Sequence, residues 1–278
     1  MRRVDNDAIA AAAGSRFESE YHYAVFEYLR SAKVIEALER AGVSLTGWIL
    51  DAGCGGGGTA LSLAEEVSFA VGLDLDARFR GSGTRLAQEK GISNAAFVQG
   101  DGGRLPFPAA SFDFVFSHSV IEHVTSAEIY LRECHRVLKE GGILYLSTAP
   151  YLSLAGAHLP RLFVPIPLHI LLGRRVAFRV FCFLARHAPW SLQEPKNANS
   201  FVMLAAQGKE KEDDLLQAVT VKRVEAWIQA SGFRIVREDR YTTGFFRAFP
   251  GPVRRFLEAT PWAQDVMTGQ IQCVLQKL

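Results

Sequence analysis

Short apolar runs alternate along this chain with longer segments in which apolar residues recur at every third or fourth position. Five runs have the length and composition of buried strands: residues 48–52, 69–74, 96–98, 112–116 and 143–147. Segments of helical spacing separate most of them, the clearest being 127–138. Because strands that alternate with helices build open sheets covered on both faces, the pattern predicts an α/β fold with a doubly wound, mostly parallel sheet.

Both ends of the chain extend this pattern. Residues 8–41 keep helical spacing until Gly42, so we expect a helical preface before the first strand. Farther on, a predicted helix at 221–230 and a strand at 233–236 precede an alternating strand at 270–276. No helix follows this last strand, so we expect it to lie antiparallel beside its predecessor in a seven-stranded, Rossmann-like sheet.

The alternation of strands and helices breaks after Pro150. Residues 151–218 carry prolines, arginines and aromatic side chains, followed by a charged run at 209–214 that is typical of a solvated connection. The pattern therefore divides the chain into a helical preface at 1–44, a core at 45–150, a cap insertion at 151–218 and a completion of the α/β core at 219–278.

The composition is that of an ordinary globular protein, with 49% hydrophobic and 22% charged residues among 278, enough for one sizeable core. The net charge of +2 is too balanced to indicate nucleic-acid binding through bulk charge. We therefore expect no nucleic-acid partner, and any basic surface must be local.

The cysteines predict neither a disulfide framework nor a metal site, because they lack C-x-x-C and Cys/His spacing. They are Cys54, Cys134, Cys182 and Cys273. No metal is expected, and a reducing, cytoplasmic location is the simplest interpretation. Acidic residues precede any apolar stretch at the N-terminus, so no signal peptide is expected. The apolar run 162–173 is too short to span a bilayer and contains Pro165 and Pro167.

The segment 49–58 carries the strongest chemical signal, because an apolar strand ends there in four consecutive glycines. Glycine tolerates positive φ and has no Cβ, so the turn can be tight and its amides can approach a ligand closely. A predicted helix opens directly after it at Thr59.

The glycine spacing alone fits two classes of nucleotide-binding protein. Gly53, Gly55 and Gly58 satisfy the G-x-G-x-x-G fingerprint of dinucleotide enzymes. With the acidic residue Asp51 in front, the turn also satisfies the acidic-x-G-x-G-x-G form of S-adenosylmethionine enzymes. Landmarks downstream have to decide between the two.

Six landmarks in order resemble the class I S-adenosylmethionine-dependent methyltransferases, most closely their small-molecule, type 11-like branch. They are the glycine turn with Asp51, the strand end at 71–74, Gly100-Asp101, the segments 105–108 and 111–113, Ile121-Glu122-His123-Val124 and the segment 138–143. The resemblance covers residues 45–150 and, more weakly, 220–240 and the last strand. An NAD enzyme would explain three glycines and a later acid, but not Asp51, Gly100-Asp101 or the antiparallel last strand.

The resemblance implies S-adenosylmethionine as cofactor and assigns its binding residues. These are the turn glycines Gly53, Gly55 and Gly57 together with Leu75, Asp51 near the methionyl end, Asp74 at the ribose, Asp101 and Gly102 at the adenine, Ser117 at the ammonium and Tyr21 in a lid formed by residues 1–44.

Each of these assignments has a structural alternative. Asp74 could be a turn acid or a helix cap, although Asp76 is the better candidate for the cap. Asp101 could be a plain turn acid. Tyr21 and its neighbour Tyr23 could simply pack in the preface. Asp51 is expected to be held ionised in either case.

Methyl transfer asks little of side chains beyond alignment and exclusion of water, so no catalytic triad is expected. His118, at the end of a strand, is the best candidate for a general base or a substrate contact, and packing under the cofactor is its alternative. His158 in the cap is a second candidate. Glu122 and His123 are expected to support their loop.

The cap carries a local excess of positive charge. No Asp or Glu occurs from Gly141 to Gln193, whereas five arginines do: Arg161, Arg174, Arg175, Arg179 and Arg186. A predicted helix at 174–186 is basic and amphipathic. Its aromatic face could pack on the sheet while its arginines are merely solvated. Alternatively, Arg175 and Arg179 could bind an anionic group of the substrate, or the helix could rest on an anionic membrane surface.

The sequence thus predicts an enzyme that methylates O, N or C of a small molecule, such as a secondary metabolite, quinone, lipid or sugar. A catalytically silent cofactor-binding partner subunit and a membrane-surface lipid methyltransferase are the alternatives. No motif identifies the acceptor or the oligomeric state.

Overall fold

A computed structural model of the chain describes residues 4–153, 156, 158–160, 162–163, 166–194, 197–212, 215 and 217–278. Two cap residues named above, Arg161 and Pro165, lie outside this described part.

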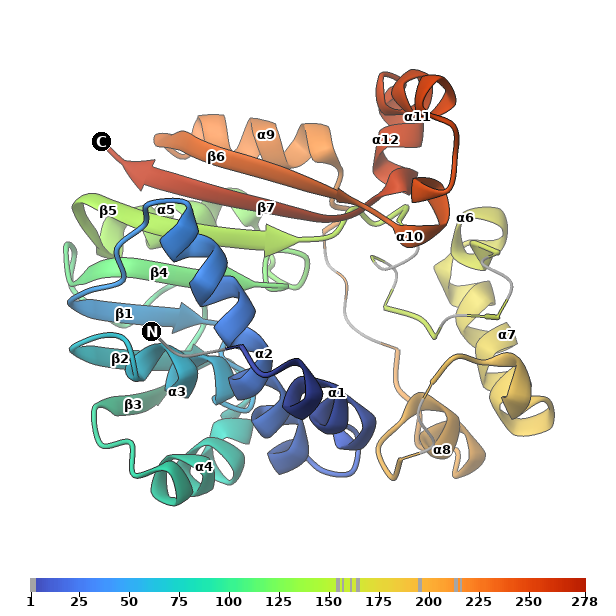
Figure 1. The fold of residues 1–278 in the computed structure, drawn as a ribbon, viewed down its shortest axis with the longest axis horizontal. Coiled ribbons are helices and arrows are strands. Elements are labelled where there is room, and N and C mark those ends of the chain that lie inside the picture. The colour runs from blue at the N-terminus through green and yellow to red at the C-terminus, as the bar shows by residue number, and fades with distance from the viewer. Residues whose placement is uncertain are drawn as a thin grey trace.

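The core is one seven-stranded sheet with the order β3-β2-β1-β4-β5-β7-β6 (Figure 1). The strands are β1 (Trp48–Ala52), β2 (Phe69–Asp74), β3 (Ala95–Gln99), β4 (Phe112–His118), β5 (Leu138–Thr148), β6 (Phe233–Thr242) and β7 (Thr268–Lys277). The pairs among β1 to β5 are parallel, and β7 pairs antiparallel with both β5 and β6. The predicted doubly wound sheet with an antiparallel last strand is confirmed.

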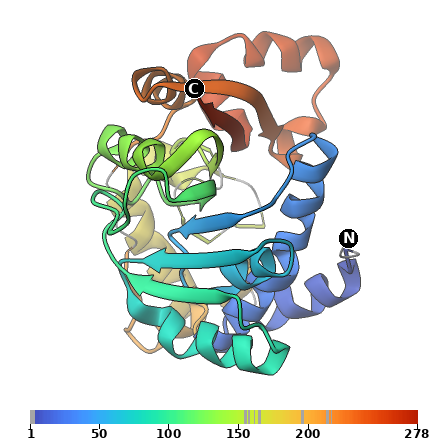
Figure 2. The ribbon, with the colours of Figure 1, turned by 90° about the vertical axis from the view of Figure 1, so that its left-hand side faces the viewer.

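Both faces of the sheet are covered because successive side chains of each strand point to opposite sides. Leu50 belongs to the cluster under α5 (Ala127–Val137) and α9 (Val221–Ala230), whereas its neighbour Ile49 packs with residues of α2 (Glu20–Arg40). Figure 2 shows α2 on one side of the sheet and α5 on the other. The helices α3 (Gly58–Ala64) and α4 (Ser82–Lys90) pack beside α2.

The preface is two helices rather than the single one expected. α1 (Asn6–Ser15) and α2 are separated by a turn, and Ser19 caps α2 by accepting from the His22 amide at 3.3 Å. A serine at this position offers the orphan amides of a helix start a side-chain acceptor, which explains the break. The apolar spacing continues across the turn and conceals it.

The cap lies beyond the carboxyl ends of the parallel strands (Figure 1). It contains α6 (Leu168–Leu172), α7 (Arg174–His187), the 3-10 helix η2 (Pro189–Ser191) and α8 (Phe201–Ala206). Phe181 of α7 and Val202 of α8 belong to a hydrophobic cluster confined to the cap. The interpretation that the apolar face of this helix packs on the sheet is therefore wrong, because α8 and the neighbouring loops cover that face.

Three helices between β6 and β7 were not predicted: α10 (Gly244–Arg247), α11 (Gly251–Glu258) and α12 (Pro261–Met267). β6 is also longer than its apolar start at 233–236, because its charged second half continues to pair with β7. Charged residues are typical of a strand at the edge of a sheet. Within the described ranges, no helix is long and apolar enough to cross a membrane.

Candidate functional site

The glycine turn joins β1 to α3 at the carboxyl edge of the sheet. Gly53, Gly55 and Gly57 have φ values of +94°, +52° and +88°, where side chains other than glycine are strained. A Cβ on Gly53 would lie 2.3 Å from Cγ2 of Val120, in the loop after β4. The sequence needs glycine here both for the left-handed backbone and for close packing.

Hydrogen bonds inside the protein occupy the amides of this turn. Gly53 donates to the carbonyl of Leu73 at 2.7 Å, and Gly57 donates to the carbonyl of Cys54 at 2.8 Å. Gly55 donates to Oδ2 of Asp74 at 2.8 Å. At these three glycines the turn thus offers a ligand a bare Cα surface edged by carboxylates rather than free amides.

Asp74 ends β2 and faces the glycine turn. Its Oδ1 accepts from the Asp76 amide at 2.9 Å, so each carboxylate oxygen uses one lone pair and keeps another. Leu75, the next residue, has 71% of its surface exposed and is placed to cover a flat ligand. Asp76 stands at the cap position of a short 3-10 helix, η1 (Ala77–Arg80), but makes no capping bond with its side chain.

Asp51 is a buried acid whose Oδ2 has no hydrogen-bond partner among the described residues. Burial raises the pKa of this carboxyl well above its usual range, and the negative charges of Glu27 and Asp74 raise it further. In the unliganded chain this pKa direction runs against the expectation that backbone donors and positive charge keep Asp51 ionised. An orphaned buried carboxyl group of this kind fits a cationic ligand.

Glu27 of α2 is a site residue that the sequence analysis missed. A Cβ on Gly55 would lie 4.0 Å from Oε2 of Glu27, so this carboxyl group lies directly over the glycine turn. Burial raises its pKa to about 7, although Arg30 and Arg78 pull the pKa down. The sequence signal that could have revealed Glu27 is an acidic residue next to the buried face of α2, which includes Ala24 and Tyr28.

Tyr21 and Tyr23 of the preface lie on different faces of α2. Tyr21 donates to Glu89 of α4 and lies under the guanidinium of Arg85, whose Cζ is 3.9 Å from the ring centroid. Burial raises the pKa of Tyr23, and the negative charge of the nearby Glu27 raises it further. A contact of Tyr21 with the cofactor stays a prediction, and Tyr23 is the tyrosine that shares a face with Glu27.

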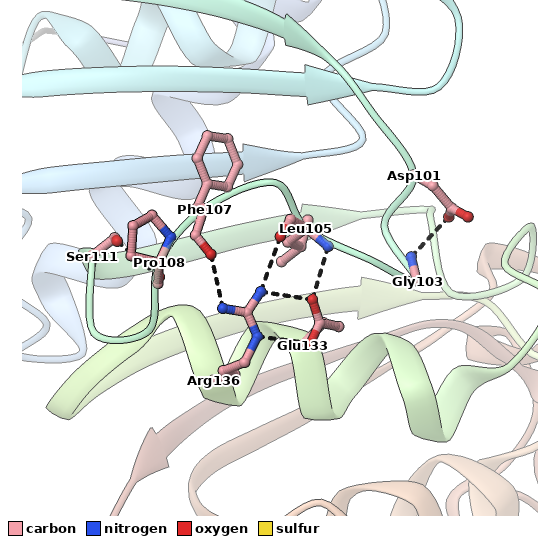
Figure 3. Close-up of polar contacts among 8 residues, drawn as sticks. All are labelled: Asp101, Gly103, Leu105, Phe107, Pro108, Ser111, Glu133 and Arg136. Atoms are coloured by element: carbon pink, nitrogen blue, oxygen red, sulfur yellow. Dashed lines mark hydrogen bonds and ion pairs between the residues drawn. The ribbon is translucent and has the colours of Figure 1, made fainter.

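Asp101 and Gly102 follow β3 at the same edge of the sheet. The Asp101 side chain is exposed and its Oδ1 accepts from the Gly103 amide at 2.8 Å, as in a turn (Figure 3). A Cβ on Gly102 would lie 3.0 Å from the ring of Tyr130. The backbone here therefore sits closely on the core while the carboxylate keeps a free oxygen toward solvent.

A hydrogen-bond network explains the proline-rich landmark that follows. Arg136 of α5 donates to the carbonyls of Phe107 and Leu105 at 2.8 and 3.0 Å and pairs with Glu133. Glu133 in turn accepts from the Leu105 amide at 2.8 Å (Figure 3). The pair ties the segment 105–108 to α5, and Arg136 lowers the pKa of Glu133.

Ser117 and His118 end β4. Ser117 is fully buried and its Oγ accepts from the hydroxyl of Tyr130 at 2.7 Å, a partner that the sequence did not reveal. His118 stacks on Phe116, and its Nδ1 has no partner among the described residues. Burial lowers the pKa of His118 to about 4, and Arg30 acts in the same direction. The imidazole is therefore neutral near pH 7, and the low pKa makes it a weak base in the unliganded chain.

His158 reaches the core from the cap. Its Nε2 lies 3.8 Å from Oε1 of Glu122, and its ring centroid lies 5.2 Å from that of His123. Oε2 of Glu122 accepts from the Thr148 hydroxyl at 2.9 Å. The loop after β4 and the first part of the cap thus meet at this carboxylate.

The arginines of α7 divide into two pairs. Arg174 pairs with Glu212 at 2.6 Å, while Arg186 pairs with Glu210 and donates to the carbonyl of Ala205 at 2.8 Å. Two glutamates of the charged run near the end of the cap, Glu210 and Glu212, therefore bind α7, so this part of the run is more than a solvated connection. Arg175 and Arg179, the predicted substrate-binding pair, are exposed.

Comparison with known proteins agrees with this geometry. Residues 50–146 match the family model described as a methyltransferase domain. The uncharacterized methyltransferase YcgJ of Bacillus subtilis is 37% identical over 34% of this chain and 37% of its own length. A malonyl-[acyl-carrier protein] O-methyltransferase of Enterobacter lignolyticus is 30% identical over 58% of this chain and 59% of its own length. The chain thus spans between a third and three fifths of these two curated relatives.

A solved structure shares the fold. The magnesium protoporphyrin IX methyltransferase of Synechocystis PCC 6803, with bound S-adenosylhomocysteine, has a TM-score of 0.52 and 17% identity, covering 93% of this chain and 86% of that one. Residues 50–146 thus form a methyltransferase domain, and the sheet order is that of the fold shared by class I S-adenosylmethionine-dependent methyltransferases.

Proposed function

We propose that this chain transfers a methyl group from S-adenosylmethionine to an O, N or C atom of a small-molecule acceptor. The observation that carries the proposal is the grouping of Asp51, Asp74 and Glu27 around the glycine turn. S-adenosylmethionine carries a cationic sulfonium and an ammonium group, which would relieve the mutual repulsion of these carboxylates. A dinucleotide pyrophosphate would add negative charge to the same place.

Residues at the ends of different strands are assigned to different parts of the cofactor. The spare lone pairs of Asp74 suit the two ribose hydroxyls, and the exposed Leu75 suits one face of the adenine. Asp101 and the backbone at Gly102 are assigned to the adenine edge. Ser117 and Asp51 are assigned to the methionyl end, where the orphaned Oδ2 of Asp51 can accept from an ammonium group.

The chemistry requires little from the side chains. The cofactor supplies a methyl group on a sulfonium, which is already a strong electrophile. The chain has to hold the acceptor in line with that methyl group and exclude water. Where the accepting atom is protonated, His118 and His158 are the candidate bases; His118 is neutral near pH 7, and its low pKa has to rise when cofactor and acceptor bind for it to take the proton efficiently.

Equilibrium binding tests this proposal. Calorimetry on the purified chain is expected to show S-adenosylmethionine binding in the micromolar range and no heat with NAD⁺ at the same concentrations. Transfer of labelled methyl groups is then measured with phenolic, carboxylate and amine acceptors. Preferential binding of NAD⁺ would overturn the assignment, and cofactor binding without transfer to any acceptor would favour the silent partner subunit.

A second candidate function, action at a membrane surface, is favoured by the outer face of the cap. Seven large apolar side chains of this region are exposed: Phe163, Ile166, Leu171, Leu172, Val176, Phe183 and Trp190. The exposed Arg175 and Arg179 lie among them, while Arg174 and Arg186 are neutralised by glutamates. Aromatic and apolar side chains interspersed with arginine suit the interface of an anionic bilayer.

Vesicle co-sedimentation tests this surface. The chain is expected to bind phosphatidylcholine vesicles that contain phosphatidylglycerol and to bind pure phosphatidylcholine vesicles weakly. The double substitution Arg175→Glu and Arg179→Glu should weaken binding by at least tenfold, because each charge near the surface contributes about 1 kcal/mol. Arg132→Glu with Lys222→Glu, exposed on α5 and α9, is the matched control. Equal binding to both vesicles, or dimerisation through this face, contradicts the candidate.

We propose a cytoplasmic location for the protein. All four cysteines are buried and unpaired in the structure, which suits a reducing compartment.

A further inference from the structure

The loop after β4 and the start of the cap gather three groups that bind metals. Glu122 is 4% exposed, with Oε2 fixed by the Thr148 hydroxyl and Oε1 directed at His158. His123 lies beside both. One potential ligand atom of each residue lies within 4.8 Å of the other two.

The backbone holds His158 in an uncommon conformation to make this approach. Its φ of +51° lies in the left-handed region, which residues other than glycine seldom adopt. Ser119, at the start of the loop that carries Glu122, has a φ of +56°. Gln217, near the end of the cap, donates from its backbone amide to the carbonyl of Glu122 at 3.0 Å. Both chain segments of the cluster are therefore fixed by the fold.

We propose that Glu122, His123 and His158 form a binding site for a divalent transition metal such as Zn²⁺. Two imidazoles and one carboxylate form a donor set that Zn²⁺ and its neighbours accept readily. Two ligands of one ion lie at most about 4.2 Å apart, since each bond is about 2.1 Å. The 3.8 Å between Glu122 and His158 meets this limit, and the ligand atoms of all three residues lie within 4.8 Å of one another, so a small inward movement would bring them to one ion.

The site deepens the proposed function and rests on it, because it names the class of acceptor. Three protein ligands leave at least one open position, as in catalytic zinc sites. An acceptor hydroxyl bound there loses its proton more readily, since a cation stabilises the alkoxide or phenolate. The inferred substrate class is therefore an oxygen acceptor: its O–H proton passes to solvent, the new O–CH₃ bond forms, the S–CH₃ bond breaks, and S-adenosylhomocysteine leaves.

The position of the cluster supports this role. Glu122 and His123 lie in the loop whose Val120 contacts the glycine turn, and Thr148 ends β5 at the same edge of the sheet. His158 belongs to the cap. A bound ion would therefore pin the cap to the core at the carboxyl edge, where the acceptor has to meet the methyl group.

The experiment is a metal titration of the chelator-treated, full-length chain. Calorimetry with Zn²⁺ is expected to show one site, and Co²⁺ is expected to produce the visible absorption of a low-symmetry complex. His158→Ala and Glu122→Gln should each weaken Zn²⁺ binding at least tenfold and remove the Co²⁺ absorption. His187→Ala, an exposed histidine of α7, is the matched control and should bind like the unmodified chain.

Thermal melting separates loss of the site from loss of the fold. Zn²⁺ should raise the melting temperature of the unmodified chain and of His187→Ala, but not of His158→Ala, whose circular dichroism should be unchanged. Identical Zn²⁺ binding by the unmodified chain and His158→Ala would overturn the site.

S-adenosylmethionine binding measured on the same samples distinguishes this proposal from the proposed function. If the chain binds S-adenosylmethionine but no metal, the metal site is contradicted and the proposed methyltransferase function stands. If the chain binds the metal but not S-adenosylmethionine, the proposed function and the inferred class of acceptor are both contradicted.

Discussion

The backbone amide of Gly55 donates to Oδ2 of Asp74 at 2.8 Å, which ties the turn after β1 to the end of β2. The same carboxylate therefore shapes the turn and presents the lone pairs assigned to the ribose. Because both tasks use one side chain, its loss should damage cofactor binding more than the loss of two ribose contacts alone.

Asp74→Ala is accordingly expected to weaken S-adenosylmethionine binding by at least about 100-fold, since each hydrogen bond to a charged group contributes about 1.5–3 kcal/mol. Calorimetry measures the affinity. Asp76→Ala, which removes an exposed carboxylate two residues farther on, should change it less than threefold. If both variants bind equally well, Asp74 does not hold the ribose.

Cofactor affinity should depend on pH through Glu27. Burial raises the pKa of its carboxyl to about 7, with Arg30 and Arg78 opposing and Asp74 and Glu20 reinforcing the rise. A cation binds the ionised form better, so the affinity for S-adenosylmethionine should fall as the pH decreases from 8 to about 6. The neutral sulfur of S-adenosylhomocysteine should give a shallower dependence.

Glu27→Gln is the matching variant. It should bind S-adenosylmethionine more weakly at pH 8 and remove most of the pH dependence. The free energy of unfolding should depend on pH in the direction opposite to the cofactor affinity. Because the pKa of Glu27 is about 7 in the folded state and 4.5 ordinarily, the folded state binds more protons than the unfolded state between these pH values. The free energy of unfolding of the unliganded chain should therefore fall as the pH rises through this window, and should do so less in Glu27→Gln.

Gly58 is required for the close approach of α2 to the glycine turn. A Cβ there would lie 2.0 Å from the carbonyl oxygen of Ala24 and 2.9 Å from the amide nitrogen of Tyr28. Gly58→Ala should lower the free energy of unfolding by about 1–3 kcal/mol, because backbone atoms have to move. It should also weaken cofactor binding, since α2 carries Glu27. Urea denaturation measures the stability.

Gly81→Ala provides the control for Gly58. Gly81 has an ordinary backbone conformation, and nothing lies within 4 Å of the position of its Cβ. This variant should stay within about 0.5 kcal/mol of the unmodified chain. Equal stability of the two variants would mean that α2 does not sit on the turn as described.

The core was predictable because its signals are local. A run such as 48–52 is short, apolar and followed by glycine, so about ten consecutive residues suffice to predict the strand, the turn and the start of the helix. The sheet order then follows from the resemblance and from the few ways of winding such units. Asp51, Asp74 and Asp101 could be placed at one edge of the sheet because each lies at, or within two residues of, the carboxyl end of a strand.

The missing parts depend on contacts distant in sequence. Glu27 and Asp51 are separated by 24 positions, and only the packing of α2 on Gly58 brings the former over the turn. The amides of the turn are occupied by Leu73, Cys54 and Asp74, which no spacing reveals. Likewise, His158 meets Glu122 only through a left-handed backbone, so the cluster with His123 escapes a search for metal-ligand spacing.

His118 provides a test of whether the chain supplies a base. Its pKa of about 4 keeps the imidazole neutral over the physiological range, so no inflection from His118 is expected in the rate between pH 6 and 9. If His118 accepts the acceptor's proton, His118→Ala should lower kcat by about 10²–10⁴. The Kd for S-adenosylmethionine should change less than threefold, because the proton is taken from the acceptor.

The control for His118 is again His187→Ala, which removes an exposed imidazole from α7. An equal loss of turnover and cofactor affinity in His118→Ala would assign His118 to packing beneath the cofactor instead. Stability gives an independent check of its burial: with the folded pKa below the ordinary 6.5, the unfolded state binds more protons between about 4 and 6.5. The free energy of unfolding should therefore rise with pH across that window, and His118→Asn should remove part of the rise.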